Sequence, residues 1–176
     1  MEADPIVLWP DRVLSTPTQK VTDFGPKLRE LLERMKRSVV EAEGIGLAAN
    51  QIGVGLRVAL VFPPEGELIE MVNPRITARR GEVLLDEACL SLPGEGEKVE
   101  RALEVDVVYQ DASGAEHTLT AKERLAHIVQ HEVDHLDGLV YVQHVGQVKR
   151  DMIRKRMERR KKYGMEPDPD EDDDES

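Results

Sequence analysis

A short segment around residue 130 gathers residue types that could bind a metal ion and move a proton. It reads His131-Glu132-Val133-Asp134-His135. On a helix, His131 and His135 lie one turn apart on one face, which is the spacing at which two imidazoles bind one divalent metal ion. Glu132 falls beside this pair, where a half-buried carboxylate can serve as general base towards water that the metal activates. The pattern therefore predicts a hydrolytic metal site.

The third metal ligand is left open by spacing alone. Two histidines and a glutamate on a helix can also be solvated or hydrogen-bonded core groups, whereas a catalytic zinc-type site usually has three protein ligands and a water. Carboxylates compete for this place with Cys89, His117, His127 and His144. His127 would stand in a straight row with the histidine pair, a poor arrangement around one ion. A thiolate from a separate strand has better geometry and suits a borderline-soft cation, which favours Cys89.

The histidine pair needs a helix to present it, and the sequence predicts one between residues 120 and 138. Thr120 and Glu123 have the spacing of a capping box, which would start the helix at Thr120. Gly138 can take the left-handed conformation that follows a helix end. An apolar stripe at helical spacing would pack this helix on the rest of the fold. The stripe comprises Leu125, Ile128, Val129 and Leu136.

The remaining apolar runs predict mainly strands. Runs of β-forming residues occupy 56–62, 68–73, 82–85, 99–109 and 116–120, and hairpin signals separate several of them. The run 99–109 alternates apolar and polar residues, which predicts one half-buried strand. We therefore expect an α+β fold in which antiparallel or mixed β-sheets pack around a central metal-binding helix.

Two further helices are expected, one towards each end of the chain. Apolar residues recur at helical spacing after Pro26, and Gly44 can end this N-terminal helix. The C-terminal helix is expected over 147–163. Residues 5–22 contain three prolines and are expected to form an extended arm packed on the domain.

Residues 44–53, GIGLAANQIG, combine small residues with one amide that could bind a ligand. Small side chains allow the backbone to approach a ligand or a second chain closely. The alternative is a tight connection from helix to strand. Gln51 favours the first interpretation, because its side-chain amide could donate to an oxyanion.

Composition limits the environment in which the protein works. Its 176 residues suit one domain with a substantial core. The one cysteine, Cys89, permits no internal disulfide and fits a reducing compartment. The N-terminal residues lack the pattern of a signal peptide, and no apolar run reaches the ~20 residues of a membrane span. We therefore expect a cytoplasmic protein that does not contact membranes.

Three motifs, at 44–53, at 87–94 (EACLSLPG) and at 130–138 (QHEVDHLDG), occur together in this chain. In this order and at these separations they resemble the peptide deformylases, over about residues 5–145. The resemblance implies a metal-dependent amide hydrolase that removes the formyl group from N-formylmethionyl nascent peptides and releases formate. In the cell the implied metal is Fe²⁺, and Zn²⁺, Ni²⁺ or Co²⁺ can occupy such a site in purified protein.

The resemblance also assigns roles to the metal-site residues. It places the metal ligands on Cys89, His131 and His135, and it makes Glu132 the general acid and base. Metal and Glu132 would deprotonate a water that attacks the formyl carbon, and Glu132 would pass the proton to the leaving amine.

Further roles follow for residues outside the metal site. The oxyanion would be stabilised by the Gln51 side chain and by the backbone N–H of Leu90. Substrate contacts would come from Ile45, Gly46 and Glu87.

The chain departs from the family pattern in the cysteine motif and near the metal helix. Ala88 stands where glycine is usual. The segment 94–97 is GEGE and lacks the arginine that several relatives carry there. Arg124 and His127 stand where some relatives have apolar pocket residues. These departures bear on side-chain preference more than on the chemistry.

The C-terminal region is strongly polarised in charge. Residues 149–162 carry nine Lys or Arg and two acids, and residues 166–176 carry eight acids and no base. We expect a catalytic domain over 1–163 that ends in the basic helix 147–163, and a disordered acidic tail over 164–176. Such a charge run is usually a solvated face, but its density suggests a surface for RNA. The resemblance implies docking near the ribosomal exit tunnel, and we expect a monomer.

Two other functions fit parts of the sequence. A His-Glu-x-x-His metallopeptidase would use the same helix, although no other part of the chain indicates a cleft for internal peptide bonds. A non-catalytic ribosome-binding domain with a structural metal would need neither Glu132 nor Gln51. Deformylation is therefore the favoured prediction.

Overall fold

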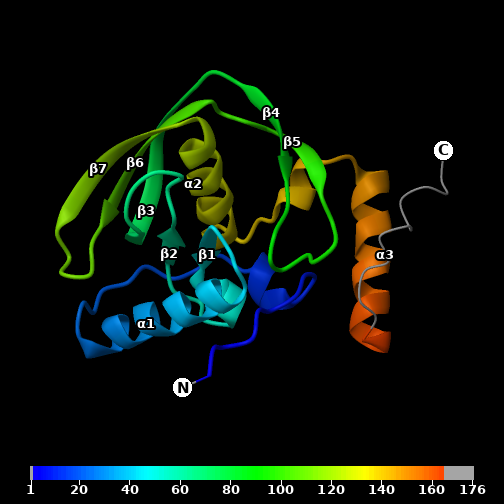
Figure 1. Ribbon diagram of the computed structural model, residues 1–176, viewed down its shortest axis with the longest axis horizontal. Coiled ribbons are helices and arrows are strands. Elements are labelled where there is room, and N and C mark those ends of the chain that lie inside the picture. The colour runs from blue at the N-terminus through cyan, green and yellow to red at the C-terminus, as the bar shows by residue number, and fades with distance from the viewer. Residues whose placement is uncertain (1, 165–176) are drawn as a thin grey trace.

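The computed structural model describes residues 2–164 and has a mixed α+β fold (Figure 1). The helices are the 3-10 turns η1 (Arg12–Ser15), η2 (Ala49–Ile52) and η3 (Tyr141–His144) and the α-helices α1 (Pro26–Glu41), α2 (Glu123–Leu136) and α3 (Gln147–Tyr163). The strands are β1 (Gly46–Ala48), β2 (Val58–Val61), β3 (Ile69–Arg80), β4 (Val83–Glu87), β5 (Glu97–Arg101), β6 (Glu104–Gln110) and β7 (Glu116–Lys122).

The strands of the described chain form two antiparallel sheets. The larger has the order β1-β2-β3-β6-β7, and the smaller pairs β4 with β5. Helix α2 lies at the centre of the molecule, against β1, β2, β3 and β7, and α1 covers the end near β1 (Figure 1). The predicted α+β fold is confirmed, with α2 as its central helix.

Helix α2 is held in place by its apolar face. Ile128, Val129 and Leu136 are buried, as the predicted stripe requires. Leu125 is partly buried against the cluster that contains Ile128 and Val129. Gly138 follows the helix with a φ of +80°, in the left-handed conformation expected of it. Packing against the sheet, which buries these side chains, supplies most of the stability of a helix this short.

The predicted start of the central helix is wrong. Thr120 belongs to β7, where its Oγ1 donates a 2.9 Å hydrogen bond to Asp106 of β6, and the helix begins at Glu123 without a side-chain cap. The ladder between β6 and β7 runs as far as Lys122. Pairing with a neighbouring strand therefore prevails over the local capping signal.

The prediction of one strand over 99–109 is also wrong. The chain breaks at Ala102 and Leu103, so that β5 belongs to the small sheet and β6 to the large one. Gln130 of α2 pairs with the backbone at this break, accepting from Ala102 N at 3.0 Å and donating to Ala102 O at 2.9 Å. Leu103 is 43% exposed instead of facing inwards with the alternating residues.

The N-terminal region agrees with the expectation in outline. Residues 5–22 are extended apart from η1, and this arm lies against the domain through hydrogen bonds such as Val7 N to Gln51 O at 2.7 Å. Helix α1 begins at Pro26 as predicted but ends at Glu41, and the residue after it with a positive φ is Glu43, not Gly44.

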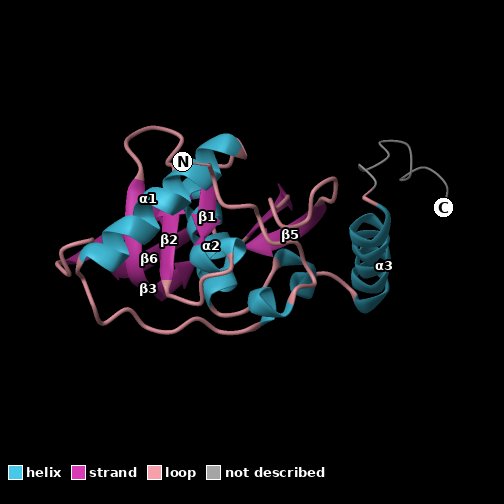
Figure 2. Cartoon of the chain, turned by 90° about the horizontal axis from the view of Figure 1, so that it is seen from below, coloured by secondary structure: helices cyan, strands magenta, loops and turns pink. Residues whose placement is uncertain are grey.

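Helix α3 has the predicted bounds and lies at one end of the molecule, beside β5 and η3 in Figure 1 and beyond β5 in Figure 2. Ile153 and Met157 are buried, whereas Val148 near the start of the helix is 73% exposed. The predicted tail from residue 165 onward lies outside the described residues. Within residues 2–164, every helix is too short or too polar to cross a bilayer.

Candidate active site and metal centre

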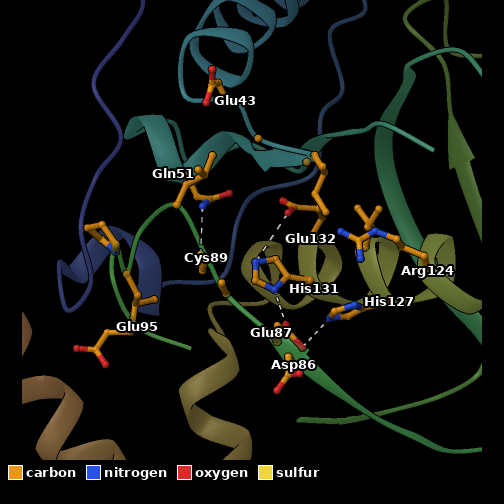
Figure 3. A pocket seen from close by; sticks show the side chains of 18 of the residues that line it. Glu43, Gln51, Asp86, Glu87, Cys89, Glu95, Arg124, His127, His131 and Glu132 are labelled. Atoms are coloured by element: carbon orange, nitrogen blue, oxygen red, sulfur yellow. Dashed lines mark hydrogen bonds and ion pairs between the residues drawn. The ribbon is translucent and has the colours of Figure 1, made fainter. Parts of the chain in front are cut away.

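Cys89, His131 and His135 come together beneath one cavity. Cys89 Sγ lies 3.2 Å from His135 Nε2, and the Nε2 atoms of the two histidines lie 3.1 Å apart. All three donor atoms lie within 4.8 Å of one another. Helix α2 carries both histidines, and the segment after β4 carries the cysteine. Figure 3 shows Cys89 and His131 of these two segments. The other histidines weighed as third ligand have different partners.

This donor set fits a divalent transition metal. Metal–nitrogen bonds of about 2.0–2.1 Å and metal–sulfur bonds of about 2.3 Å in a tetrahedron place neighbouring donors roughly 3.3–3.6 Å apart. The distances of 3.1 and 3.2 Å are close to this. A thiolate with two imidazoles suits a borderline-soft cation and not Mg²⁺ or Ca²⁺. Burial lowers the pKa of His135 well below its ordinary value, which favours the neutral imidazole that binds a cation.

Glu87 fixes the orientation of His131. Its carboxylate contacts His131 Nδ1, which turns His131 Nε2 towards Cys89 and His135. The two oxygens of Glu87 also accept from Arg101 Nη2 at 2.6 Å and Nε at 3.0 Å. Burial alone would raise the pKa of Glu87, but hydrogen bonds from His127, His131 and Arg101 hold that pKa far below its ordinary value. Glu87 was expected to contact the substrate, but both of its carboxylate oxygens have partners within the protein.

A network of charged side chains surrounds this contact. Arg101 Nη1 donates to Asp134 at 2.5 Å, and His144 Nε2 lies 2.8 Å from the same carboxylate oxygen. His127 Nε2 lies 3.0 Å from Glu87 (Figure 3). Partners of this kind beyond the ligands fix the tautomer and the ring orientation of a metal-binding histidine.

Glu132 lies beside the metal ligands and against β1. Its Oε1 is 3.9 Å from His131 Nε2, and the residue is 4% exposed. Its Oε2 is buried and has no hydrogen-bond partner among residues 2–164. A Cβ on Gly46 would stand 3.0 Å from Glu132 Oε1, so a side chain there would require this carboxylate to shift by a few tenths of an ångström. Burial raises the pKa of Glu132 to about 7. A carboxyl group of this kind can accept and return a proton near neutral pH.

Gln51 and Leu90 frame the cavity on the cysteine side. Gln51 Oε1 accepts from Ala48 N at 2.9 Å, and its Nε2 donates to Ser91 Oγ at 3.1 Å and lies 3.5 Å from Cys89 Sγ (Figure 3). The amide therefore has a fixed direction, with its donor towards the cysteine. The Leu90 backbone follows directly on Cys89.

One cavity of about 370 Å³ contains most of the predicted site. Apart from His135, which is fully buried, every predicted site residue lines it. These residues are Ile45, Gly46, Gln51, Glu87, Cys89, Leu90, His131 and Glu132. Arg124, His127 and Glu95 also line the cavity and add charged groups to a wall that is mostly apolar, as is typical of ligand pockets.

Sequence reasoning missed the roles of Arg101, Asp134 and Glu95. Arg101 is 6% exposed and lies at the end of β5, a position that no motif marks. Asp134 lies within the metal motif, but spacing alone gives it no partner. The available signal for Arg101 was its charge, because it lies within the run 99–109 that was predicted to be a half-buried strand.

Sequence comparison places the chain among known enzymes. The sequence profile described as polypeptide deformylase matches residues 3–151. The chain is 40% identical to the peptide deformylase of Acidobacterium capsulatum, over 91% of this chain and 96% of the relative. It is 39% identical to that of Wolbachia pipientis wMel, over 90% and 96%.

Solved structures agree with the sequence relatives. A peptide deformylase from Legionella pneumophila superposes with a TM-score of 0.86 at 35% identity, covering 92% of this chain and 97% of that one. A peptide deformylase from Ehrlichia chaffeensis in complex with actinonin superposes with a TM-score of 0.87 at 32% identity, covering 94% and 100%. With its cysteine and two histidines gathered beside a buried glutamate, the chain belongs to the peptide deformylase family of hydrolytic enzymes.

Proposed function

We propose that the protein removes the formyl group from N-formylmethionyl nascent peptides and releases formate. The observation that carries this function is the cluster of Cys89, His131 and His135, with the buried carboxylate of Glu132 beside it, in a chain of this family. A divalent cation held by the three ligands supplies a Lewis acid that polarises the formyl oxygen and acidifies water.

Glu132 moves the proton in this reaction. Its raised pKa allows its carboxylate to take a proton from the attacking water and later to give it to the leaving α-amine. A nearby cation would lower this pKa, because it favours the charged carboxylate. The unpartnered Oε2 of Glu132 supports this role, since an unsatisfied buried oxygen destabilises the fold and a catalytic role is one reason for a protein to retain it.

The oxyanion is stabilised by the Gln51 side chain and the Leu90 backbone N–H. Gln51 is oriented by Ala48 and Ser91, and this preorganisation is what makes such a donor effective. One donor of this type contributes about 3 kcal/mol to the transition state. Ile45 and Gly46 at the edge strand β1 would bind the substrate backbone.

Glu87 receives a different role from the one expected from the family resemblance. Because both of its oxygens have buried protein partners, we assign it to holding His131 in position, and not to a substrate contact.

The cellular setting is proposed on the same basis. Fe²⁺ is the proposed metal in the cell, by analogy with the family. Residues 1–163 would form one catalytic domain that acts as a cytoplasmic monomer. Exposed basic residues of α3, such as Lys155 and Lys161, support docking on the ribosome near the exit tunnel.

Formate release tests the proposed function. Iron-loaded protein, assayed without oxygen, is expected to release formate from formyl-Met-Ala and to leave acetyl-Met-Ala and internal peptide bonds intact. Cleavage of internal bonds would instead indicate the metallopeptidase. Metal binding without either reaction would indicate the non-catalytic metal domain.

A further inference from the structure

The loop that carries the metal-binding cysteine is also part of the cavity wall. This cysteine loop, residues 88–96, joins β4 to β5. It contains Cys89 and Leu90, and it lines the cavity with Pro93, Gly94 and Glu95. Its position therefore sets both a metal ligand and the direction of the Leu90 N–H.

Helix α3 binds one end of this loop through a buried carboxylate. Glu95 is 8% exposed, and its side chain points away from Cys89 (Figure 3). It accepts from Arg156 Nε and Nη2 at 2.8 and 2.9 Å and from Arg160 Nη1 at 2.8 Å. Arg160 Nη1 also donates to Pro93 O at 3.0 Å. One helix thus holds both a side chain and a backbone carbonyl of the loop.

The middle of the loop is held by the same helix through the N-terminal arm. The Arg154 guanidinium lies 4.7 Å from the centre of the Trp9 ring, within cation–π distance. Trp9 N donates to Ser91 O at 2.9 Å. Ile153 and Met157 of α3 share a buried cluster with Trp9, Cys89 and Leu92.

Backbone hydrogen bonds connect Glu95 to the cysteine. Glu95 N donates to Leu92 O at 3.2 Å, and Leu92 N donates to Cys89 O at 2.9 Å. Two successive turns therefore connect Glu95, which contacts α3, with Cys89. A shift at Glu95 moves Cys89 and Leu90, because closely packed turns transmit displacement.

Stability alone does not account for this arrangement. The side chains of Glu95 and Arg160 are 5% and 10% exposed, and that of Arg156 is 26% exposed. The hydration that the two more buried groups lose is only partly repaid by their mutual attraction. A bidentate contact between an arginine and a carboxylate fixes the relative orientation of the two planar groups. Catalysis requires such precision, since a misplacement of about 1 Å costs on the order of 100-fold in rate.

We propose that α3 is a positioning element of the active site, and that Arg156 and Arg160 act as positioning residues through Glu95. The proposal rests on the deformylase function stated above and adds to it. In this role the inner side of the basic helix sets the cysteine loop, while its outer side, with Lys155 and Lys161, faces solvent.

The test compares two double variants that each remove two positive charges from α3. Arg156→Met with Arg160→Met removes the contacts with Glu95, and Lys155→Met with Lys161→Met is the matched control. The first readout is amide hydrogen exchange of residues 89–96 in the metal-loaded full chain, which requires no activity. The second is kcat and KM for formate release from formyl-Met-Ala.

The arginine variant is expected to speed exchange in residues 89–96 at least about tenfold, with α1 and the large sheet unchanged. It is expected to lower kcat/KM by about 10- to 100-fold. The control should match the unmodified protein in both readouts. Arginine and control variants that agree within twofold in both readouts would overturn the proposal.

A third variant separates positioning from stability. Adding Glu95→Gln to the two arginine substitutions removes the unpaired buried carboxylate, so the melting temperature is expected to recover while kcat/KM stays low. Recovery of both would mean that the arginines serve stability alone and would overturn the proposal. If no protein, including the control, releases formate, the proposed function fails, and hydrogen exchange still decides whether α3 holds the loop.

Discussion

The Nδ1 atom of His131 lies against the carboxylate of Glu87, joining the central helix to the end of β4. This contact directs His131 Nε2 towards Cys89 and His135. The candidate metal site therefore comprises Cys89, His131 and His135 and an acid that orients one of them. Removal of the Glu87 carboxylate should therefore weaken metal binding while the sheet stays folded.

Glu87→Gln is expected to weaken metal binding by about 10- to 100-fold, the usual effect of losing such a partner. Competition with a chelator, followed by metal analysis, measures it. Glu100→Gln, an exposed change on β5, is the control. Equal affinities in the two variants would remove Glu87 from the metal site. The melting temperature should also fall, because Arg101 loses a buried partner.

Glu132→Gln is expected to retain the metal and to lose turnover. The amide keeps the shape of the side chain but cannot take a proton, so kcat should fall by about 10²- to 10⁴-fold. Formate release and metal content are measured on the same sample, with Glu116→Gln, an exposed change on β7, as reference. A Glu132→Gln protein with unreduced kcat would disprove the proposed mechanism.

Gly46→Ala tests how closely Glu132 approaches strand β1. The new Cβ would stand 3.0 Å from Glu132 Oε1, so the carboxylate must move. We expect kcat to fall by about tenfold, because a shift of a few tenths of an ångström is smaller than the ~1 Å that costs about 100-fold. The free energy of unfolding should fall by about 1–3 kcal/mol. Gly55→Ala is the matched control, because a Cβ there has no atom within 4 Å. Similar kinetics in both variants would show that Glu132 tolerates the displacement.

The pair of Arg80 and Asp106 predicts a pH effect remote from the metal. Hydrogen bonds from Arg80 and then Thr120 lower the pKa of Asp106 from 3.8 to about 2. Because the pKa is lower in the folded state, the pair stabilises the fold above about pH 4. That contribution is lost as the pH falls through about 2. NMR titration should give a pKa near 2, rising towards 3.8 in Arg80→Ala, and an unshifted value in both proteins would contradict the pairing.

The charge of the C-terminal region predicts salt-dependent binding to ribosomes. Removal of residues 165–176, which contain eight acids, should tighten binding at low salt because these acids compete for the basic helix. Sedimentation with ribosomes at several salt concentrations measures the effect. Neutralising Lys155, Lys161 and Lys162 should weaken binding and reduce its salt dependence. Unchanged binding after truncation would show that the acids do not mask the helix.

Local patterns in the sequence were sufficient for the parts of the protein governed by short-range geometry. His131 and His135 share a helix face because four residues make about one turn. Helix α3 has the bounds that its residue pattern predicts. The central helix ends before Gly138, which has the left-handed φ that the sequence indicated.

Contacts between distant segments decided the rest. Thr120 lies in β7 because it pairs with the neighbouring strand β6. The local spacing of a capping box contains no information about that strand. The run 99–109 divides because the backbone at Ala102 pairs with Gln130 from the central helix. Glu87 meets His131 and Arg101, and Glu95 meets α3, through burial that brings together charges far apart in the chain. Such long-range pairing depends on which surfaces the whole fold removes from water, and no local spacing encodes it.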